Sequence, residues 1–213
     1  MALVRKYKNR TYKIGITGGT CSGKSVVRHV LANGAFSVLD ADDALGILMA
    51  ASPQLTRQIT KKYGNTVLDH YGNISPQKFD KLQFENPFER KFVQDLVNPL
   101  IRDELKRFLY GPLGTFIRAV EWSNIYETDC QHLFDEIWLV QVTPAVQVKR
   151  IMARDGLNRE EAELLIIAES PTTQEQKAQI ATRVIDNSGD RAKTDAAVRK
   201  ILEEIRDRVF NAF

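Results

Sequence analysis

The stretch Gly18-Gly19-Thr20-Cys21-Ser22-Gly23-Lys24-Ser25 decides the fold, because it matches the pattern G-x-x-x-x-G-K-[ST] at every defined position. Glycines allow backbone conformations that are closed to other residues, so successive N–H groups can point into one concavity and hold phosphate oxygens. In this pattern the lysine, here Lys24, reaches the β- and γ-phosphates, and the last hydroxyl, here Ser25, binds Mg²⁺. The stretch therefore predicts a phosphate-binding loop rather than a glycine-rich turn that binds nothing.

The segments on either side of this loop supply the context that the pattern requires. Residues 12–17 have the character of a short strand. After the loop, four apolar residues share one helical face, namely Val26, Val27, Val30 and Leu31. A helix that starts near Gly23 adds the positive end of its dipole to the phosphate site. A strand, a phosphate loop and a helix in this order favour an α/β fold with a mostly parallel sheet.

Length and composition limit the possible domain organisation and function of the protein. A chain of 213 residues that is 43% hydrophobic and 27% charged suits one α/β core with an inserted subdomain. A net charge of +3 without a basic stripe argues against nucleic-acid binding. No stretch approaches the roughly 20 apolar residues of a membrane span. Cys21 and Cys130 lack metal-ligand spacing, so we expect a reduced, cytoplasmic protein without a membrane or nucleic-acid partner.

Three carboxylates follow a second predicted strand at residues 36–39: Asp40, Asp42 and Asp43. Ligands of open parallel sheets gather beyond the carboxyl ends of the strands, so these acids should face the same crevice as the phosphate loop. One interpretation is an N-cap and favourable first-turn charges for a helix over residues 44–50. The other is a general base that takes a proton from an acceptor hydroxyl.

The segment from about residue 50 to 110 has a helical pattern with interruptions. Leu55, Ile59 and Tyr63 recur at helical spacing until Gly64, and a long helical stretch begins at Asn86-Pro87. Helices placed between two strands of a sheet are typical of a subdomain that covers a phosphoryl-transfer site and excludes water. The segment therefore predicts either an acceptor-binding subdomain or a lid.

The rest of the chain returns to alternating strands and helices. Strands are predicted at residues 115–120, 137–142 and 183–185. A helix is predicted to begin at Thr143-Pro144, with Thr143 as its N-cap, and it carries Arg150 and Arg154 on one face. These arginines form either a solvated surface pair or a pair that closes over the transferring phosphoryl group. The last predicted helix carries an apolar stripe that packing explains.

Six segments resemble the dephospho-CoA kinase family, and they are spread over nearly the whole chain: residues 17–25, Val38-Leu39-Asp40-Ala41-Asp42, Asn98-Pro99-Leu100-Ile101-Arg102, Leu133-Phe134-Asp135-Glu136, Arg150-Ile151-Met152-Ala153-Arg154-Asp155-Gly156-Leu157, and Val184-Ile185-Asp186-Asn187-Ser188-Gly189. The phosphate loop alone would indicate only the superfamily, whereas the other segments in this order indicate the family.

This resemblance implies a three-layer P-loop NTPase fold with a mostly parallel sheet. It implies a single kinase domain over residues 12–213 after a flexible lead-in at 1–11, with a helical, CoA-binding acceptor subdomain at about 50–110 and a lid at about 150–180. The expected reaction transfers the γ-phosphoryl group of ATP to the ribose 3′-hydroxyl of dephospho-CoA, which is the last step of coenzyme A synthesis. We expect a monomer or a weak homo-oligomer.

The resemblance also assigns roles by position. Its catalytic residues are Lys24, Asp42 and Arg150, with Asp42 as the base, and Ser25 is its Mg²⁺ ligand. The implied ATP-binding residues are Gly19, Thr20, Cys21, Ser22, Gly23, Lys24, Ser25, Val26, Arg150, Arg154, Asp186 and Asn187. The implied acceptor-binding residues are Thr17, Asp40, Asp42, Asn98, Pro99 and Glu127.

The sequence departs from the family pattern on the acceptor side. Asn98 stands where a histidine is usual, residues 121–126 replace most of a Pro-Leu-Leu-Phe segment, and Glu169 stands where a glutamine is usual. An added carboxylate near phosphates should repel them. Two alternatives therefore stay open: a P-loop kinase with a changed small-molecule acceptor, and a nucleotide-binding protein of this fold without transfer activity.

Overall fold

The computed structural model describes residues 11–34, 36–75, 78, 87–112, 116–169 and 172–209. Its strands form one sheet in the order β2-β3-β1-β4-β5, with β1 in the centre. The strands are β1 (Tyr12–Thr17), β2 (Ser37–Asp40), β3 (Ile117–Glu121), β4 (Glu136–Gln141) and β5 (Arg183–Asp186). The β1–β3, β1–β4 and β4–β5 pairs are parallel, so their carboxyl ends lie at one edge of the sheet.

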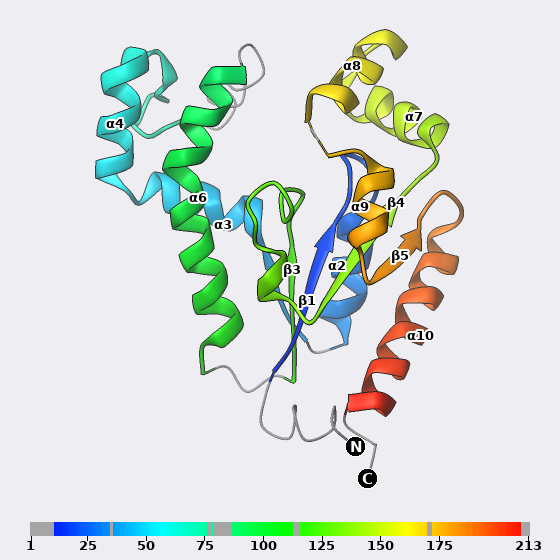
Figure 1. The fold of residues 1–213 in the computed structure, drawn as a ribbon. Helices are drawn as coiled ribbons and strands as arrows, with labels where there is room; N and C mark the ends of the chain where they lie inside the picture. The colour runs from blue at the N-terminus through cyan, green and yellow to red at the C-terminus, as the bar shows by residue number, and fades with distance from the viewer. Residues whose placement is uncertain are drawn as a thin grey trace. The chain divides into compact units, whose positions relative to one another are not determined.

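Helices separate most of these strands along the chain, and only a 3₁₀ turn stands between β3 and β4 (Figure 1). The described helices are α2 (Lys24–Asn33), α3 (Ala41–Ala50), α4 (Pro53–Tyr63), α6 (Pro87–Tyr110), α7 (Pro144–Asp155), α8 (Arg159–Glu169), α9 (Gln174–Ile180) and α10 (Arg191–Val209), with short 3₁₀ turns at Gly64–Val67 and Gln131–Leu133. None of the helices in these described ranges is long and apolar enough to cross a bilayer.

The chain divides into two compact units. The sheet unit comprises Met1–Leu39 and Leu109–Phe213, and the helical unit comprises Asp40–Phe108. The helical unit has an apolar core of its own, built from side chains of α3, α4, α6 and the turn between them: Met49, Leu55, Ile59, Val67, Ile74, Val93 and Val97. Each unit therefore has the buried apolar surface that a compact unit needs.

One face of the sheet is covered by α2 and α10. Ile14 and Ile16 of β1 point to this face, together with Trp138 and Val140 of β4. The apolar stripes of the two helices complete this core with Val27, Val30, Leu31, Val198 and Ile205. Because side chains alternate along a strand, Gly15 faces the opposite side. There Ile125 and Phe134 approach so closely that a Cβ on Gly15 would lie 2.9 Å from Ile125 Cδ1.

Helix α9 also contacts the sheet, at β4, and Figure 1 shows it on the side away from α2. The sheet therefore lies between two layers of helix and loop, and the predicted three-layer α/β fold is confirmed. The strand predicted at residues 12–17 has these bounds in the structure, and the helix that was expected to end at Gly64 does so.

One local prediction needs correction. Thr143 occupies the N-cap position of α7, but its side chain makes no capping hydrogen bond. Its backbone N–H instead donates to Ser188 Oγ at 2.9 Å, so this end of α7 is tied to the turn after β5. Two predictions lie outside the described residues: residues 1–10 of the lead-in and the side chain of Glu169.

Candidate active site

The phosphate loop connects the carboxyl end of β1 to α2, and its backbone requires glycine. Gly23 has φ = 90° and ψ = 33°, in the left-handed region that favours glycine. A Cβ at this position would overlap the side-chain amide of Asn187. At Gly18, a Cβ would overlap the carbonyl oxygen of Val140 in β4. The shape of the loop therefore depends on close contacts with β4 and with the turn after β5.

Cys21 is the one residue of the loop that is not glycine and has a positive φ, 53°. Its side chain is half-buried and packs against the small apolar cluster that joins α7 to α8, formed by Val148, Ile151 and Ala162. Packing is therefore a sufficient reason for the side chain at this position.

Lys24 is the first residue of α2, and its side chain folds back over the phosphate loop. Its Nζ donates hydrogen bonds to the carbonyl oxygens of Gly18 and Gly19, at 3.1 Å each. Ser25, the next residue of α2, is exposed. Lys24 and Ser25 therefore both stand in the first turn of α2, where the helix dipole favours negative charge.

A cavity of about 450 Å³ opens above this helix start. Its lining comes from the phosphate loop, β3, α7, the turn after β5 and the start of α10: Cys21, Gly23, Lys24, Ser25, Val26, Glu121, Arg150, Arg154, Asn187, Gly189 and Arg191. Four of these side chains are cationic and one is anionic, so the cavity suits a ligand with several negative charges.

Arg150 and Asn187 join α7 and the end of β5 to the phosphate loop. Arg150 donates to the carbonyl oxygens of Cys21 and Ser22 at 3.4 Å each, and to that of Asn187 at 2.8 Å. Asn187 is 3% exposed and donates through Nδ2 to Ser22 O at 2.8 Å. Its Oδ1 accepts from Thr194. Both polar atoms of the Asn187 side chain are therefore bonded within the protein, and its amide nitrogen holds the phosphate loop at Ser22.

Arg154 lies one turn beyond Arg150 and is 53% exposed. Its guanidinium group makes two hydrogen bonds of 2.7 Å to the carboxylate of Asp155, which lower the pKa of that carboxyl group. Asp186 accepts from the hydroxyl and the N–H of Ser188, and these bonds lower its pKa. Asp186 thus closes the turn that carries Asn187 and Gly189.

Two of the predicted acceptor residues belong to the sheet unit, and both are buried. Thr17 is fully buried and its hydroxyl donates to Ser123 O at 3.1 Å. The carboxylate of Glu127 forms an ion pair of 3.0 Å with Lys177, and the two side chains are 6% and 3% exposed.

The other predicted acceptor residues belong to the helical unit. Asp40 is the N-cap of α3, and its Oδ1 accepts from the N–H groups of Asp42 and Asp43. This outcome fits the capping interpretation of Asp40. Asp42 is exposed in the first turn, and Asn98 and Pro99 lie within α6.

Comparison with known proteins identifies the family. The family model described as dephospho-CoA kinase matches residues 12–193, which is most of the chain. The chain belongs to the dephospho-CoA kinase family. A dephospho-CoA kinase from Streptococcus agalactiae is 35% identical over 83% of this chain and 90% of its own. One from Staphylococcus epidermidis is 30% identical over 90% of this chain and 94% of its own.

Solved structures share the fold of this chain. A protein from Thermus thermophilus is 28% identical and superposes with a TM-score of 0.75, covering 92% of this chain and 99% of its own. The dephospho-CoA kinase from Campylobacter jejuni has a TM-score of 0.66 at 21% identity, covering 91% of this chain and 96% of its own, and this likeness shows the fold. The family match and the curated relatives show that the chain is an enzyme, a kinase with a nucleotide-binding P-loop.

Three residues that line the cavity of this kinase are not among the predicted site residues: Glu121, Gly189 and Arg191. Glu121 ends β3, beside β1, and forms an ion pair of 2.7 Å with Arg28 of α2. Its position at the carboxyl end of a predicted strand was a usable signal. Arg191 begins α10 just after the turn at residues 186–189, and no sequence pattern distinguished it from the other surface arginines.

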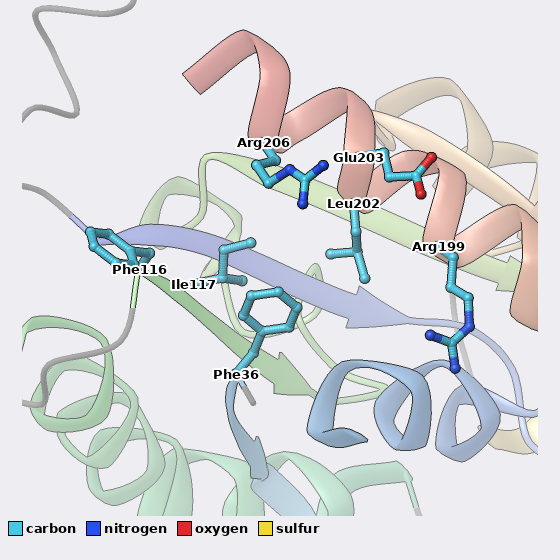
Figure 2. A pocket seen from close by; sticks show the side chains of 7 residues that line it. All are labelled: Phe36, Phe116, Ile117, Arg199, Leu202, Glu203 and Arg206. Atoms are coloured by element: carbon cyan, nitrogen blue, oxygen red, sulfur yellow. The ribbon is translucent and has the colours of Figure 1, made fainter. Parts of the chain in front are cut away.

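A second cavity, of about 580 Å³, lies at the opposite edge of the sheet (Figure 2). Ile117 starts β3 and pairs with Tyr12 at the start of β1, so this is the amino-terminal edge of both strands. Figure 2 shows Phe36, Ile117 and Leu202 facing one another inside it. The cavity lacks the phosphate loop, and ligands of parallel sheets bind at the other edge. It is therefore not the candidate active site.

Proposed function

We propose that this kinase transfers the γ-phosphoryl group of ATP to the ribose 3′-hydroxyl of dephospho-CoA, which yields coenzyme A and ADP. The bond from the γ-phosphorus to the β,γ-bridging oxygen breaks, and a bond from that phosphorus to the 3′-oxygen forms. The observation that carries the proposal is the cavity in which the phosphate loop, Lys24 and the two arginines of α7 meet. Its size and positive charge suit a nucleoside triphosphate.

The chain's contribution on the ATP side is positioning and neutralisation of charge. Phosphoryl transfer spreads charge over the γ-phosphate oxygens, and fixed cations stabilise it best. Arg150 is already held by three carbonyl oxygens, so its guanidinium group needs little rearrangement. Lys24 would exchange the carbonyl oxygens of Gly18 and Gly19 for phosphate oxygens, and Arg154 would close from the exposed end of α7.

A magnesium ion fits the donors that line this cavity. The hydroxyl of Ser25 and the carboxylate of Glu121 are oxygen ligands, which Mg²⁺ prefers. Bound with ATP, the ion would neutralise charge on the β- and γ-phosphates. The described residues contain no cluster of three or more His, Cys, Asp or Glu residues for a metal held by the protein alone.

Asp42 is the proposed general base, which takes the proton of the 3′-hydroxyl as that oxygen attacks. Its carboxylate is exposed on the first turn of α3, while Asp40 beside it is used as the cap. We infer that the other predicted acceptor residues, Thr17, Asp40, Asn98, Pro99 and Glu127, also serve acceptor binding, and that residues of about 150–180 act as the lid. A cytoplasmic location and a monomeric or weakly oligomeric state stay predictions from the sequence.

The decisive experiment is product analysis by mass spectrometry after incubation with MgATP and dephospho-CoA. We expect coenzyme A from the unmodified protein and none above background from Lys24→Ala. Direct binding of ATP is measured in parallel. ATP binding without coenzyme A formation would contradict the proposal and would favour a changed acceptor or a non-catalytic role. A screen of nucleoside and sugar acceptors would then separate these two alternatives.

A further inference from the structure

Helix α9 is attached to the sheet unit in an unusual way. It has seven residues, from Gln174 to Ile180, and the one residue that it buries is Lys177. A helix this short is not stable alone in water, so its contacts must hold it in place. A lysine is among the residues least often fully buried, and an apolar side chain would anchor the helix with less desolvation. The presence of a lysine at the one buried position of α9 therefore needs an explanation.

The partners of Lys177 lie in the loop that follows β3. Its Nζ forms the 3.0 Å ion pair with Glu127 and donates to Ser123 O at 3.3 Å. The same carbonyl oxygen accepts from the hydroxyl of Thr17, the last residue of β1 before the phosphate loop. The ammonium group of Lys177 thus holds the loop after β3 at two residues, Glu127 and Ser123. Ser123 is also hydrogen-bonded to Thr17, directly before the phosphate loop.

A second contact of α9 is made by Gln174, about one turn before Lys177. Gln174 donates through Nε2 to Gln147 Oε1 at 3.3 Å, and Gln147, which is 4% exposed, donates to Thr20 O of the phosphate loop at 2.9 Å. A Cβ on Gly19 would come within 2.8 Å of Gln147 and 2.9 Å of Gln174. Residues 174 and 177 therefore reach the phosphate loop and the loop after β3 from one short helix.

Geometry explains why a charge is used here. An apolar contact leaves the helix free to slide, whereas an ammonium group with a carboxylate and a carbonyl as partners has one best position. The loop after β3 begins at the edge of the sheet where the phosphate loop begins, because the β1–β3 pairing brings Ile16 opposite Glu121. A displacement of about 1 Å between groups that align two reactants can cost about 100-fold in rate.

We propose that Lys177 is a positioning residue for phosphoryl transfer, which fixes the loop after β3 relative to the phosphate loop through Glu127 and Ser123. This inference deepens the proposed function and rests on it. ATP itself is held elsewhere, since Arg150 and Asn187 fix the phosphate loop independently of Lys177. Loss of Lys177 should therefore reduce the rate of transfer and leave ATP affinity in place.

The test compares four variants by kcat, by the Kd of ATP and by thermal melting. Lys177→Met removes the charge, and Lys177→Arg keeps it. Lys177→Met combined with Glu127→Leu removes both charges, so that no unpaired carboxylate stays buried if the single variant fails to fold. Lys200→Met is the control, because Lys200 is an exposed lysine of α10 outside the site.

We expect Lys177→Met, which keeps Glu127, to bind ATP within about twofold of the unmodified protein, while its kcat falls about tenfold or more. The double variant also removes Glu127, a predicted acceptor residue, so it is the control for folding, and we expect it to melt near the unmodified protein. Lys177→Arg should recover most of kcat, and Lys200→Met should match the unmodified protein. Normal kcat in folded Lys177→Met or in the folded double variant would overturn the proposal, as would a loss of kcat that only follows the folded fraction. Unmodified protein that makes no coenzyme A would instead refute the proposed function, and that result is obtained before any variant is compared.

Discussion

At the scale of single residues, the phosphate loop depends on positions where no side chain fits. Gly23 combines a positive φ with direct contact to Asn187. Gly46, in the middle of α3, has an ordinary φ and no atom within 4 Å of a Cβ built on it. A side chain would therefore be strained at Gly23 and would meet no steric obstacle at Gly46, although both residues lie in or beside a helix.

Alanine at these two glycines should act in opposite directions. Gly23→Ala should lower the free energy of unfolding by about 1–3 kcal/mol through backbone strain, and should abolish ATP binding by displacing Asn187. Gly46→Ala should raise the free energy of unfolding by about 0.5–1 kcal/mol, because alanine favours the helix more than glycine does. Urea unfolding and ATP titration check both; ATP affinity retained in Gly23→Ala would contradict this account of the loop.

Asp42 and Asp43 form a matched pair of exposed carboxylates in the first turn of α3. Asp42→Asn should lower kcat by about 10²–10⁴-fold, the usual effect of removing a general base, and should leave the Kd of ATP unchanged. Asp43→Asn loses the same interaction with the helix dipole and should keep its turnover. Steady-state kinetics with both variants give the answer, and equal turnover in the two would remove Asp42 as the base.

At the scale of elements, α10 is bound to the sheet by a buried carboxylate. Glu136 at the start of β4 accepts hydrogen bonds from Arg183 of β5 and from Arg208 of α10, at 2.9 Å and 2.5 Å. Trp138 Nε1 donates to it as well, at 2.9 Å. Burial by itself would raise the pKa of Glu136, but the hydrogen bonds from Arg183, Trp138, Arg208 and Tyr12 lower it from 4.5 to about 2.

This cluster predicts an acid-sensitive attachment of α10. The pKa of Glu136 is lower in the folded state, so its stabilisation is present above pH 4.5 and is lost as the pH falls toward 2. The loss should amount to about 3 kcal/mol in the free energy of unfolding, at about 1.4 kcal/mol per pKa unit. Urea unfolding between pH 6 and 2 measures it. Glu136→Gln should be less stable at pH 6 and should show a shallower slope, and parallel curves for the two proteins would contradict this role.

At the scale of the whole molecule, two units with separate cores share one chain. The sheet unit holds the phosphate loop, the cavity beside it and the predicted acceptor residues Thr17 and Glu127. The helical unit holds the other predicted acceptor residues: Asp40, Asp42, Asn98 and Pro99. A ligand of the cavity stabilises the unit that binds it, because it binds the folded state and not the unfolded chain.

MgATP at about one hundred times its Kd should add about 2.7 kcal/mol to stability and raise Tm by about 5–11 °C. AMP lacks the β- and γ-phosphates that we propose the loop and Lys24 to hold, and it should raise Tm much less. Differential scanning calorimetry with both nucleotides measures the difference, with Lys24→Ala as the control. An equal shift from AMP would mean that the triphosphate is not recognised by the phosphate loop.

Local sequence patterns determined most of the elements. The strand at Tyr12–Thr17, the helix end at Gly64 and the phosphate loop follow from periodicity, from glycine and from a motif, and all of these act within a few residues of chain. Such patterns reflect which backbone conformations a short segment can adopt, so the chain order of strands and helices is readable without the fold.

Only the tertiary structure decided which side chains meet. Asn187 bonds Ser22 from 165 positions away, and Lys177 finds Glu127 across 50 positions of chain. Glu121 and Arg191 enter the cavity because the strand order puts β3 beside β1 and leads the chain after β5 back to the phosphate loop. These partners depend on strand order and packing, which no short segment encodes, and for that reason a buried ion pair such as Lys177–Glu127 has no signal in the sequence.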